Sequence, residues 1–183
     1  MHTEKIAFGE ASEASAIFRP SSEESIHLSG FYTVECIGPD GAVKWTDTVE
    51  NLVTTAGKNF ALDTVLGAGT AAAMKLGLID NASFTAVAAA DTMASHAGWI
   101  ESTVYSNASR PTPSFGSASA ASKASTATAF NINASGTITG CFLTDTATKG
   151  GATGLLYSAG QFSGGNKVVA NLDTLNVTYT GTA

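Results

Sequence analysis

The sequence predicts an all-β protein, with a single β-sandwich or barrel-like domain, one short helix and an extended N-terminal arm. Short runs of β-branched, aromatic and small residues recur along the chain, and turn residues interrupt them roughly every eight to twelve positions, as in all-β domains. The last run alternates cleanly, with Leu175, Val177 and Tyr179 on one face and threonine or asparagine between them. The chain has 183 residues, of which 44% are hydrophobic, and this suits one domain with a substantial core.

Residues 1–25 are predicted to form the arm, and residues 26–183 the sandwich or barrel domain. The arm mixes Glu, Ser and Ala with isolated apolar residues and sustains neither a helical nor a strand period. Such a segment buries too little apolar surface to order by itself, so it is either a flexible tail or an arm that a partner holds. The candidate partner-binding residues are Ile6, Phe8, Ile17, Phe18 and Arg19.

The first predicted unit of the domain is a hairpin. Residues 26–37 are rich in β-formers, Gly38-Pro39-Asp40-Gly41 has the composition of a β-turn, and residues 42–49 return with alternating apolar and polar positions.

A helix is predicted near 55–66. Thr54 or Thr55 can cap its start and Gly67 its end. The apolar residues Phe60, Ala61, Val65 and Leu66 are expected to form one side of it.

The middle of the chain predicts shorter elements. These are a strand over 72–79, a helix or loop over 84–90, a helical turn over 92–97 capped by Asp91, and a strand that includes Trp99, Ile100, Val104 and Tyr105. Prolines 111 and 113 interrupt regular structure, and the Ser/Ala-rich residues 116–125 predict a surface loop or an edge strand.

Alternating and β-rich runs return in the last third. The expected strands are 126–132, 137–143, 155–162, 167–170 and 174–180. A turn at 133–136 is expected to pair the first two as a hairpin, with Ile138 and Phe142 on one face of the second strand.

Charge is scarce in this chain. Charged residues make up 13%, against about 25% in typical soluble domains. Ser, Thr, Ala, Gly and Asn must therefore cover much of the surface, which is either packed against partners or simply a neutral β surface. The net charge of −6 and the scattering of the nine basic residues argue against nucleic-acid binding.

The sequence gives two expectations about the cellular compartment. No apolar run reaches the roughly 18–20 residues of a membrane span, and residues 1–13 lack the apolar region of a secretory leader. We therefore expect a soluble protein that is made in a cytoplasm and does not bind membranes. Cys36 and Cys141 are expected to be buried free thiols rather than a disulfide framework.

Candidate chemistry is sparse. Asp91, Ser95 and His96 suggest a nucleophile system, but no G-x-S-x-G elbow is present, and a structural role for Asp91 and His96 is favoured. The three histidines lack metal-ligand spacing, and we expect neither a metal site nor a cofactor. A calcium site assembled from distant carboxylates stays open.

Glycine pairs and tryptophans have structural and functional interpretations. Gly150-Gly151 and Gly164-Gly165 lack a phosphate-loop pattern and are expected to be turn glycines. Trp45 and Trp99 could stack on sugars or bases, but core packing is favoured.

Several short motifs together resemble a family of tailed-bacteriophage virion structural proteins. The motifs are DTMASHAGW at 91–99, Arg110-Pro111, TKGG at 148–151, LYSAGQFSGG at 156–165 and DTLNVTYT at 173–180, and upstream pieces around Trp45, Asn51, Gly57 and Asp63 extend them. The resemblance covers about residues 28–180, and the arm has no counterpart in it.

Members of this family are variously described as head-decoration, tail-fibre-like or virion proteins. The resemblance implies structural roles for the motif residues: Asp91 caps a turn, Trp99 packs, and the glycines permit tight bends. It transfers no catalytic residue.

The sequence and the resemblance therefore predict a capsid decoration (cement) protein on the outer surface of a phage head. The expected partner is the major capsid protein, and a homo-oligomer is expected, with a trimer favoured. The alternative is a tail- or fibre-associated protein that binds host-surface carbohydrate, for which Tyr105 or Phe115 would be exposed near a concave site. An enzyme such as a depolymerase would need clustered Asp and Glu, which the sequence does not show, so we expect no enzymatic activity.

Overall fold

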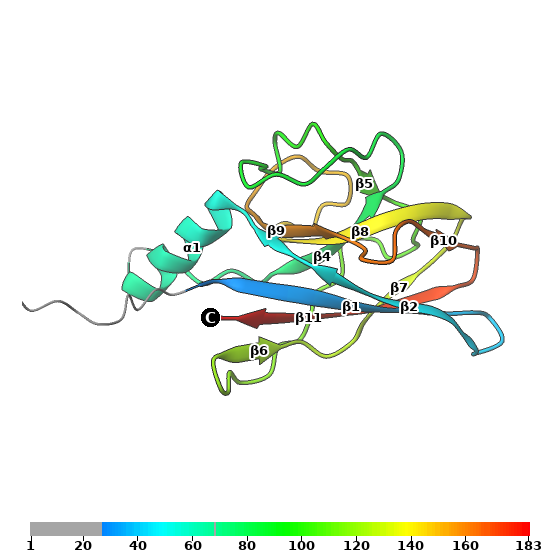
Figure 1. The fold of residues 1–183 in the computed structure, drawn as a ribbon, viewed down its shortest axis with the longest axis horizontal. Helices are drawn as coiled ribbons and strands as arrows, with labels where there is room; N and C mark the ends of the chain where they lie inside the picture. Colours follow the sequence, from blue (N-terminus) through cyan, green and yellow to red (C-terminus); the bar gives the residue numbers. More distant parts are fainter. Residues whose placement is uncertain (1–26, 68) are drawn as a thin grey trace, which may run out of the picture.

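Two antiparallel sheets pack face to face in the computed structural model, which describes residues 27–67 and 69–183 (Figure 1). The all-β prediction is confirmed, and of its two architectures the structure has the sandwich. Within the described residues there is one α-helix, as predicted.

The first sheet has β1 and β11 at its centre. β1 (Ser29–Ile37) pairs with β2 (Val43–Glu50) on one side and with β11 (Thr174–Thr182) on the other. The far edge of β11 carries β6 (Ser122–Ala124) and β7 (Thr128–Asn131). The predicted hairpin of β1 and β2 is confirmed, and its turn is closed by a bond of 2.9 Å from the Gly41 amide to the Gly38 carbonyl.

The second sheet is centred on β8 (Gly136–Thr144). Its order is β3 (Leu52–Val53), β9 (Leu156–Gln161), β8, β4 (Lys75–Asp80) and β5 (Glu101–Ser102), and β10 (Lys167–Val169) also pairs with β8.

The predicted hairpin of 126–132 with 137–143 is wrong. β7 pairs with β11 in the first sheet, whereas β8 pairs with β4, β9 and β10 in the second, so the turn at 133–136 carries the chain between the sheets. The Asn133 amide bonds to the Val104 carbonyl, at 3.1 Å. Turn residues specify a change of direction, but not which strand the next segment joins.

The main core lies between the sheets. Leu175, Val177 and Tyr179 of β11 point into it, as the alternation predicts, and Tyr32 and Val34 of β1 lie among the same buried side chains. Leu76, Leu78, Ile138, Cys141 and Leu143 contribute from the second sheet.

A β-bulge in β8 places Ile138 and Phe142 on opposite faces. Gly140 pairs with Ile79 and Ile138 with Asp80, so Thr139 is an extra residue opposite β4. Ile138 consequently belongs to the core between the sheets and Phe142 to the cluster on the outer face. The predicted shared face is wrong because the bulge breaks the period of two.

Residues 81–100 form an outer layer over the second sheet (Figure 1). Met93 and Trp99 from this segment pack with Ile79 and Phe142 of the sheet. Both faces of β4 and β8 are therefore buried, which explains why these strands lack polar alternation.

The helical turn predicted over 92–97 is wrong. Thr92 and Ser95 exchange backbone hydrogen bonds of 3.0 and 3.2 Å across a tight turn. Asp91 accepts from the preceding Ala88 amide at 2.9 Å instead of capping a helix. Residues 84–90 contain neither helix nor strand, and the strand expected after them is only the two residues of β5.

The single described helix, α1 (Thr55–Leu66), begins and ends as predicted. Thr54 Oγ1 accepts a 2.9 Å bond from the Gly57 amide, and Gly67 closes the helix with a φ of 90°. Gly57 is buried because the helix backbone lies directly on Tyr157 of β9, where a Cβ would collide with the Tyr157 carbonyl.

The predicted apolar side of α1 is only partly confirmed, because Phe60 and Ala61 are partly buried whereas Val65 and Leu66 are exposed. Val65 is 79% exposed, Leu66 80% and Leu62 51%. Near its start the helix contacts the sandwich through Gly57 and makes a bond from the Thr55 amide to the Ala89 carbonyl, whereas the apolar side chains of its second half are exposed among the described residues.

Residues 1–26 and 68 lie outside the described part of the chain. The predicted arm and its candidate residues Ile6, Phe8, Ile17, Phe18 and Arg19 therefore have no structural description here. In the described ranges, no helix has the length and apolar character needed to cross a membrane.

Candidate functional site

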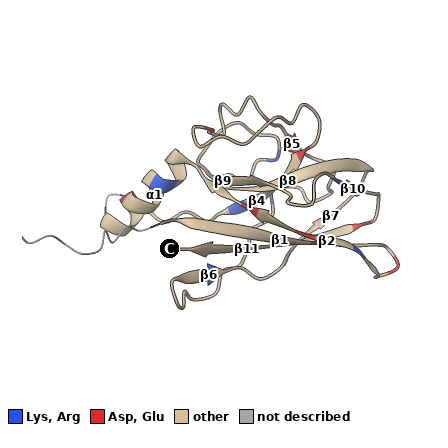
Figure 2. Ribbon diagram, viewed as in Figure 1, with Lys and Arg blue, Asp and Glu red and all other residues tan. Residues whose placement is uncertain are grey.

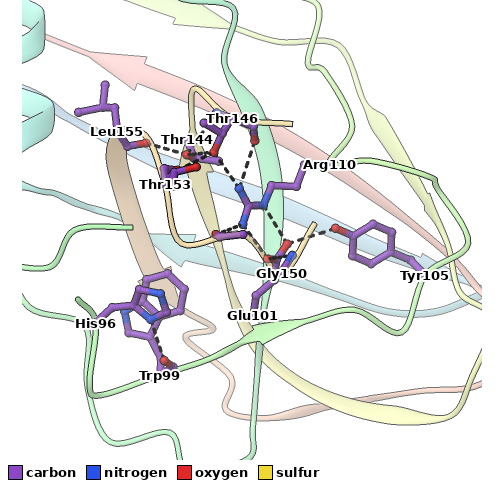
Figure 3. Close-up of polar contacts among 11 residues, drawn as sticks. His96, Trp99, Glu101, Tyr105, Arg110, Thr144, Thr146, Gly150, Thr153 and Leu155 are labelled. Atoms are coloured by element: carbon purple, nitrogen blue, oxygen red, sulfur yellow. Dashed lines mark hydrogen bonds and ion pairs between the residues drawn. The ribbon is translucent and has the colours of Figure 1, made fainter. Parts of the chain in front are cut away.

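Asp91 and His96 both hold Trp99 in place. Trp99 Nε1 donates to Asp91 Oδ2 at 2.9 Å, and the His96 ring stacks on the indole with 3.9 Å between ring centres. His96 Nδ1 lies 2.8 Å from the Trp99 carbonyl oxygen, so this nitrogen carries the proton and donates (Figure 3). The arrangement matches the structural interpretation of these residues, since each is engaged by the buried tryptophan.

A buried arginine, Arg110, organises the loops beside Trp99 (Figure 3). Its Nε and Nη2 donate to the two carboxylate oxygens of Glu101 at 3.0 and 2.8 Å. Nη1 donates to Thr146 Oγ1 and to the Thr146 carbonyl at 3.0 and 3.2 Å, and Nη2 donates to the Gly151 carbonyl at 2.9 Å. All five N–H groups of the guanidinium donate hydrogen bonds. These bonds offset the desolvation free energy of burying its charge.

Glu101 is shared by two further donors. The Gly150 amide donates to Oε2 at 2.6 Å, and the Tyr105 hydroxyl donates to Oε1 at 3.3 Å. Burial, and then the neighbouring Glu101 carboxylate, raise the pKa of Tyr105 well above its ordinary value. The phenol therefore stays protonated and acts as a donor.

Lys149 completes this cluster. Its Nζ donates to the carbonyls of Tyr105 and Asn107 at 2.7 and 3.1 Å and lies 4.4 Å from the centre of the Tyr105 ring. The Arg110 cluster, by which we mean Glu101, Tyr105, Arg110, Thr146 and Lys149 with the 150–151 backbone, ties residues 101–110 to residues 146–151.

Sequence reasoning did not identify the Arg110 cluster as a unit. Arg110-Pro111 and Thr148–Gly151 both belong to the motifs of the resemblance. This is the signal in the sequence that could have linked the two segments. Nothing in their spacing indicated that they touch, or that Glu101 joins them.

Two more ion pairs connect strands. Lys44 Nζ lies 2.6 Å from Asp173 Oδ2, and Lys167 Nζ lies 2.7 Å from Asp47 Oδ2. Burial alone would raise the pKa of Asp173, but bonds from Lys44 Nζ and the Ala170 amide outweigh it, and the net pKa is lowered.

The cysteines are free and buried, as predicted. Burial, followed by the Asp173 carboxylate, raises the pKa of the Cys36 thiol to about 11. Burial also raises the pKa of Cys141. Because the thiolate is the reactive form, both sulfurs are held in their inert state near neutral pH.

The remaining candidates have structural positions. Gly150 and Gly165 have positive φ angles of 73° and 77°, as expected of turn glycines. Trp99 is buried in the outer cluster, while Trp45 is only partly buried and donates to the Val168 carbonyl at 3.1 Å. Across residues 27–67 and 69–183, no group of three or more His, Cys, Asp or Glu side chains is placed to hold a metal ion.

An apolar groove lies at the end of the sandwich beside α1. Its volume is about 610 Å³, within the range of about 300–1,000 Å³ typical of ligand pockets. Phe60 and Val65 of α1 lie on its rim, with Leu143, Tyr157 and Tyr179 below, and Lys123 is its one charged lining residue. Figure 1 shows α1, β6, the start of β1 and the C-terminus together at this end of the molecule.

The two aromatic residues proposed for a carbohydrate site, Tyr105 and Phe115, differ in their exposure. Tyr105 is fully buried, so its predicted exposure is wrong, because the hydroxyl is used by Glu101 and the ring by Lys149. Phe115 is partly exposed and lines the groove.

Charged residues are few along the described ribbon, most of which is formed by uncharged residues (Figure 2). Comparisons with protein-family models, curated proteins and solved structures found no match to this chain.

Proposed function

We propose that this protein is a bacteriophage virion structural protein, specifically a capsid decoration (cement) protein that binds the major capsid protein on the outside of the head. The observation that supports this most directly is how the chain uses its ionisable groups. Arg110, Glu101 and Lys149 serve one internal cluster, and Lys44–Asp173 and Lys167–Asp47 connect strands.

The low charge content of the chain is suited to assembly with other subunits. With 13% charged residues, little charge must be desolvated when the protein is covered by a neighbour. Weak contacts of this kind become effective when many copies bind one lattice, because multivalency multiplies them. A homo-oligomer, with a trimer favoured, would provide such multivalency.

The N-terminal arm is the proposed contact with the capsid. It leads directly into β1, and its apolar residues can add backbone or side-chain contacts to a neighbouring subunit by β-augmentation. Ile6 and Phe8 lie farthest from the sandwich along the chain and are the proposed capsid anchors.

Binding to purified phage heads tests this function. Heads that lack decoration protein are mixed with the full-length chain, with a chain lacking residues 1–25, and with an Ile6→Ser/Phe8→Ser variant. Co-sedimentation and electron microscopy are expected to show high occupancy for the full-length chain and at least about tenfold weaker binding for both altered chains. Leu172→Ser is the matched control, since this exposed side chain lies in a turn away from α1.

Two outcomes contradict the proposal. If the full-length chain does not bind heads, the capsid assignment is wrong. If the altered chains are folded by circular dichroism and bind as well as the full-length chain, the role of the arm is wrong.

A tail- or fibre-associated carbohydrate-binding protein is the second candidate, favoured by the position of Phe115 in a concave groove. Immunogold labelling of virions separates the candidates, because labelling of the head supports decoration and labelling of the tail tip supports the second.

We also propose that the protein is not an enzyme. Asp91 and His96 are both occupied in supporting Trp99. An Asp91→Ala/His96→Ala variant that remained folded but lost a polysaccharide-degrading activity of the parent protein would overturn this.

A further inference from the structure

The groove beside α1 is an apolar surface that the described residues leave uncovered. Six residues define its apolar wall: Phe60, Val65, Met74, Pro113, Phe115 and Tyr157. Val65 is 79% exposed, and the helix that carries it contacts the sandwich near its start, where Gly57 lies against Tyr157. A concave, mostly apolar groove of this kind is a candidate binding site.

A polar atom in the same wall also lacks a partner. Thr64 lines the groove, and its Oγ1 is buried without a hydrogen-bond partner among residues 27–67 and 69–183. Such an atom usually binds something in the native protein, because a buried unsatisfied hydroxyl is costly. The groove beside Thr64 can take the apolar side chains of a peptide segment.

The chain enters the described structure at this same groove. Leu28 and Ser29, the residues that lead into β1, line it. Ahead of them in the sequence, Ile17 and Phe18 are adjacent large apolar residues, separated from Leu28 by the nine residues from Arg19 to His27.

We propose that the groove is the docking site of the segment around Ile17 and Phe18 of the same chain. Nine residues can span up to roughly 30 Å when extended, so the segment can reach any part of a groove that begins at Leu28. Pro20, Ser21 and Ser22 are residue types that favour the required reversal. A short linker gives an effective concentration near the millimolar range, which favours the chain's own segment over one from another copy.

This inference concerns the isolated protein and does not rest on the virion assignment. It assigns Ile17 and Phe18 to their own domain and leaves Ile6 and Phe8, farther along the arm, for a partner. The docked segment would hold the start of the arm against the sandwich and cover the side of α1 that lines the groove, at Phe60, Thr64 and Val65.

Hydrogen exchange of the full-length protein tests the docking. An Ile17→Ser/Phe18→Ser variant is expected to exchange the amides of the second half of α1 about tenfold faster than the parent, because the cover is lost. The matched control Ile6→Ser/Phe8→Ser is expected to exchange like the parent. Equal exchange in all three proteins would overturn the proposal, as would an equal acceleration by both variants.

Disulfide trapping identifies which chain supplies the segment. Arg19→Cys, which leaves both apolar anchors in place, and Val65→Cys are introduced together into the full-length protein, and isotopically heavy and light preparations are mixed before mild oxidation. Docking within one chain predicts crosslinked peptides that are all-heavy or all-light. Mixed heavy–light crosslinks would show that a second copy occupies the groove, and the absence of a crosslink would show that the segment next to Ile17 and Phe18 does not reach it. Either result overturns the proposal.

Discussion

The outer face of the second sheet and the end of the sandwich beside α1 are built in opposite ways. On the outer face, Trp99 and Arg110 are almost fully buried, and each of their polar N–H groups has a partner. At the α1 end, Val65 is exposed and Thr64 Oγ1 is buried without a partner in the described ranges. The first region closes on itself, whereas the second is suited to receive another segment.

Removal of Arg110 should produce the largest loss of stability. Arg110→Met leaves the buried Glu101 carboxylate without its cation, and breaking a buried pair in this way typically costs about 3–5 kcal/mol. Urea unfolding followed by circular dichroism measures the change.

The Glu101→Gln/Arg110→Met double variant is the control for this loss. It should recover at least about 1 kcal/mol over Arg110→Met, because no unpaired charge remains. Equal stability of the single variant and the parent would show that the Arg110 cluster does not hold the outer face together.

Loss of the Asp91 carboxylate should have an intermediate effect. In Asp91→Ala, Trp99 Nε1 stays buried without its acceptor, and we expect a loss of about 1–3 kcal/mol. Tryptophan fluorescence during denaturation reports on it. Asp63→Ala on exposed α1 is the matched control, and a loss equal to the control would contradict the assigned role.

Acid should weaken the Lys44–Asp173 pair. The pKa of Asp173 is lowered in the folded state, so its contribution is complete above the unfolded value of about 3.9 and is lost as the pH falls through the folded value. Urea midpoints are expected to fall less between about pH 5 and pH 2 in Asp173→Asn than in the parent. Identical pH profiles would contradict this.

The smallest effect is expected at Leu66. This side chain is 80% exposed and does not line the groove, so Leu66→Gln should change the unfolding free energy by no more than about 0.5 kcal/mol. A loss above about 2 kcal/mol, measured by the same urea unfolding, would show that the native protein buries Leu66 and that the open region is wider than the groove.

The features that the sequence predicted well are local. Thr54 and Gly67 specify the ends of α1, Gly38–Gly41 specifies the first turn, and the alternation at Leu175, Val177 and Tyr179 identifies the inward face of β11. In each case, the determining interactions lie within a few residues of one another.

The incorrect predictions concern contacts between distant segments. The bulge at Thr139 depends on the pairing of β8 with β4, and the sheet change between β7 and β8 depends on partners far along the chain. The Arg110 cluster likewise joins residues up to 49 positions apart. A single sequence contains no signal for these pairings, which is why the cluster and the groove were not predicted.

The central pairing of the first sheet has a consequence for biosynthesis. β1 leaves the ribosome well before its neighbour β11, because the paired residues Ser29 and Thr182 are separated by 153 positions. Until then one side of β1 has no strand to bind, so the nascent polypeptide carries an open edge that invites aggregation. Chaperones that shield such edges during translation should therefore raise the yield of native protein.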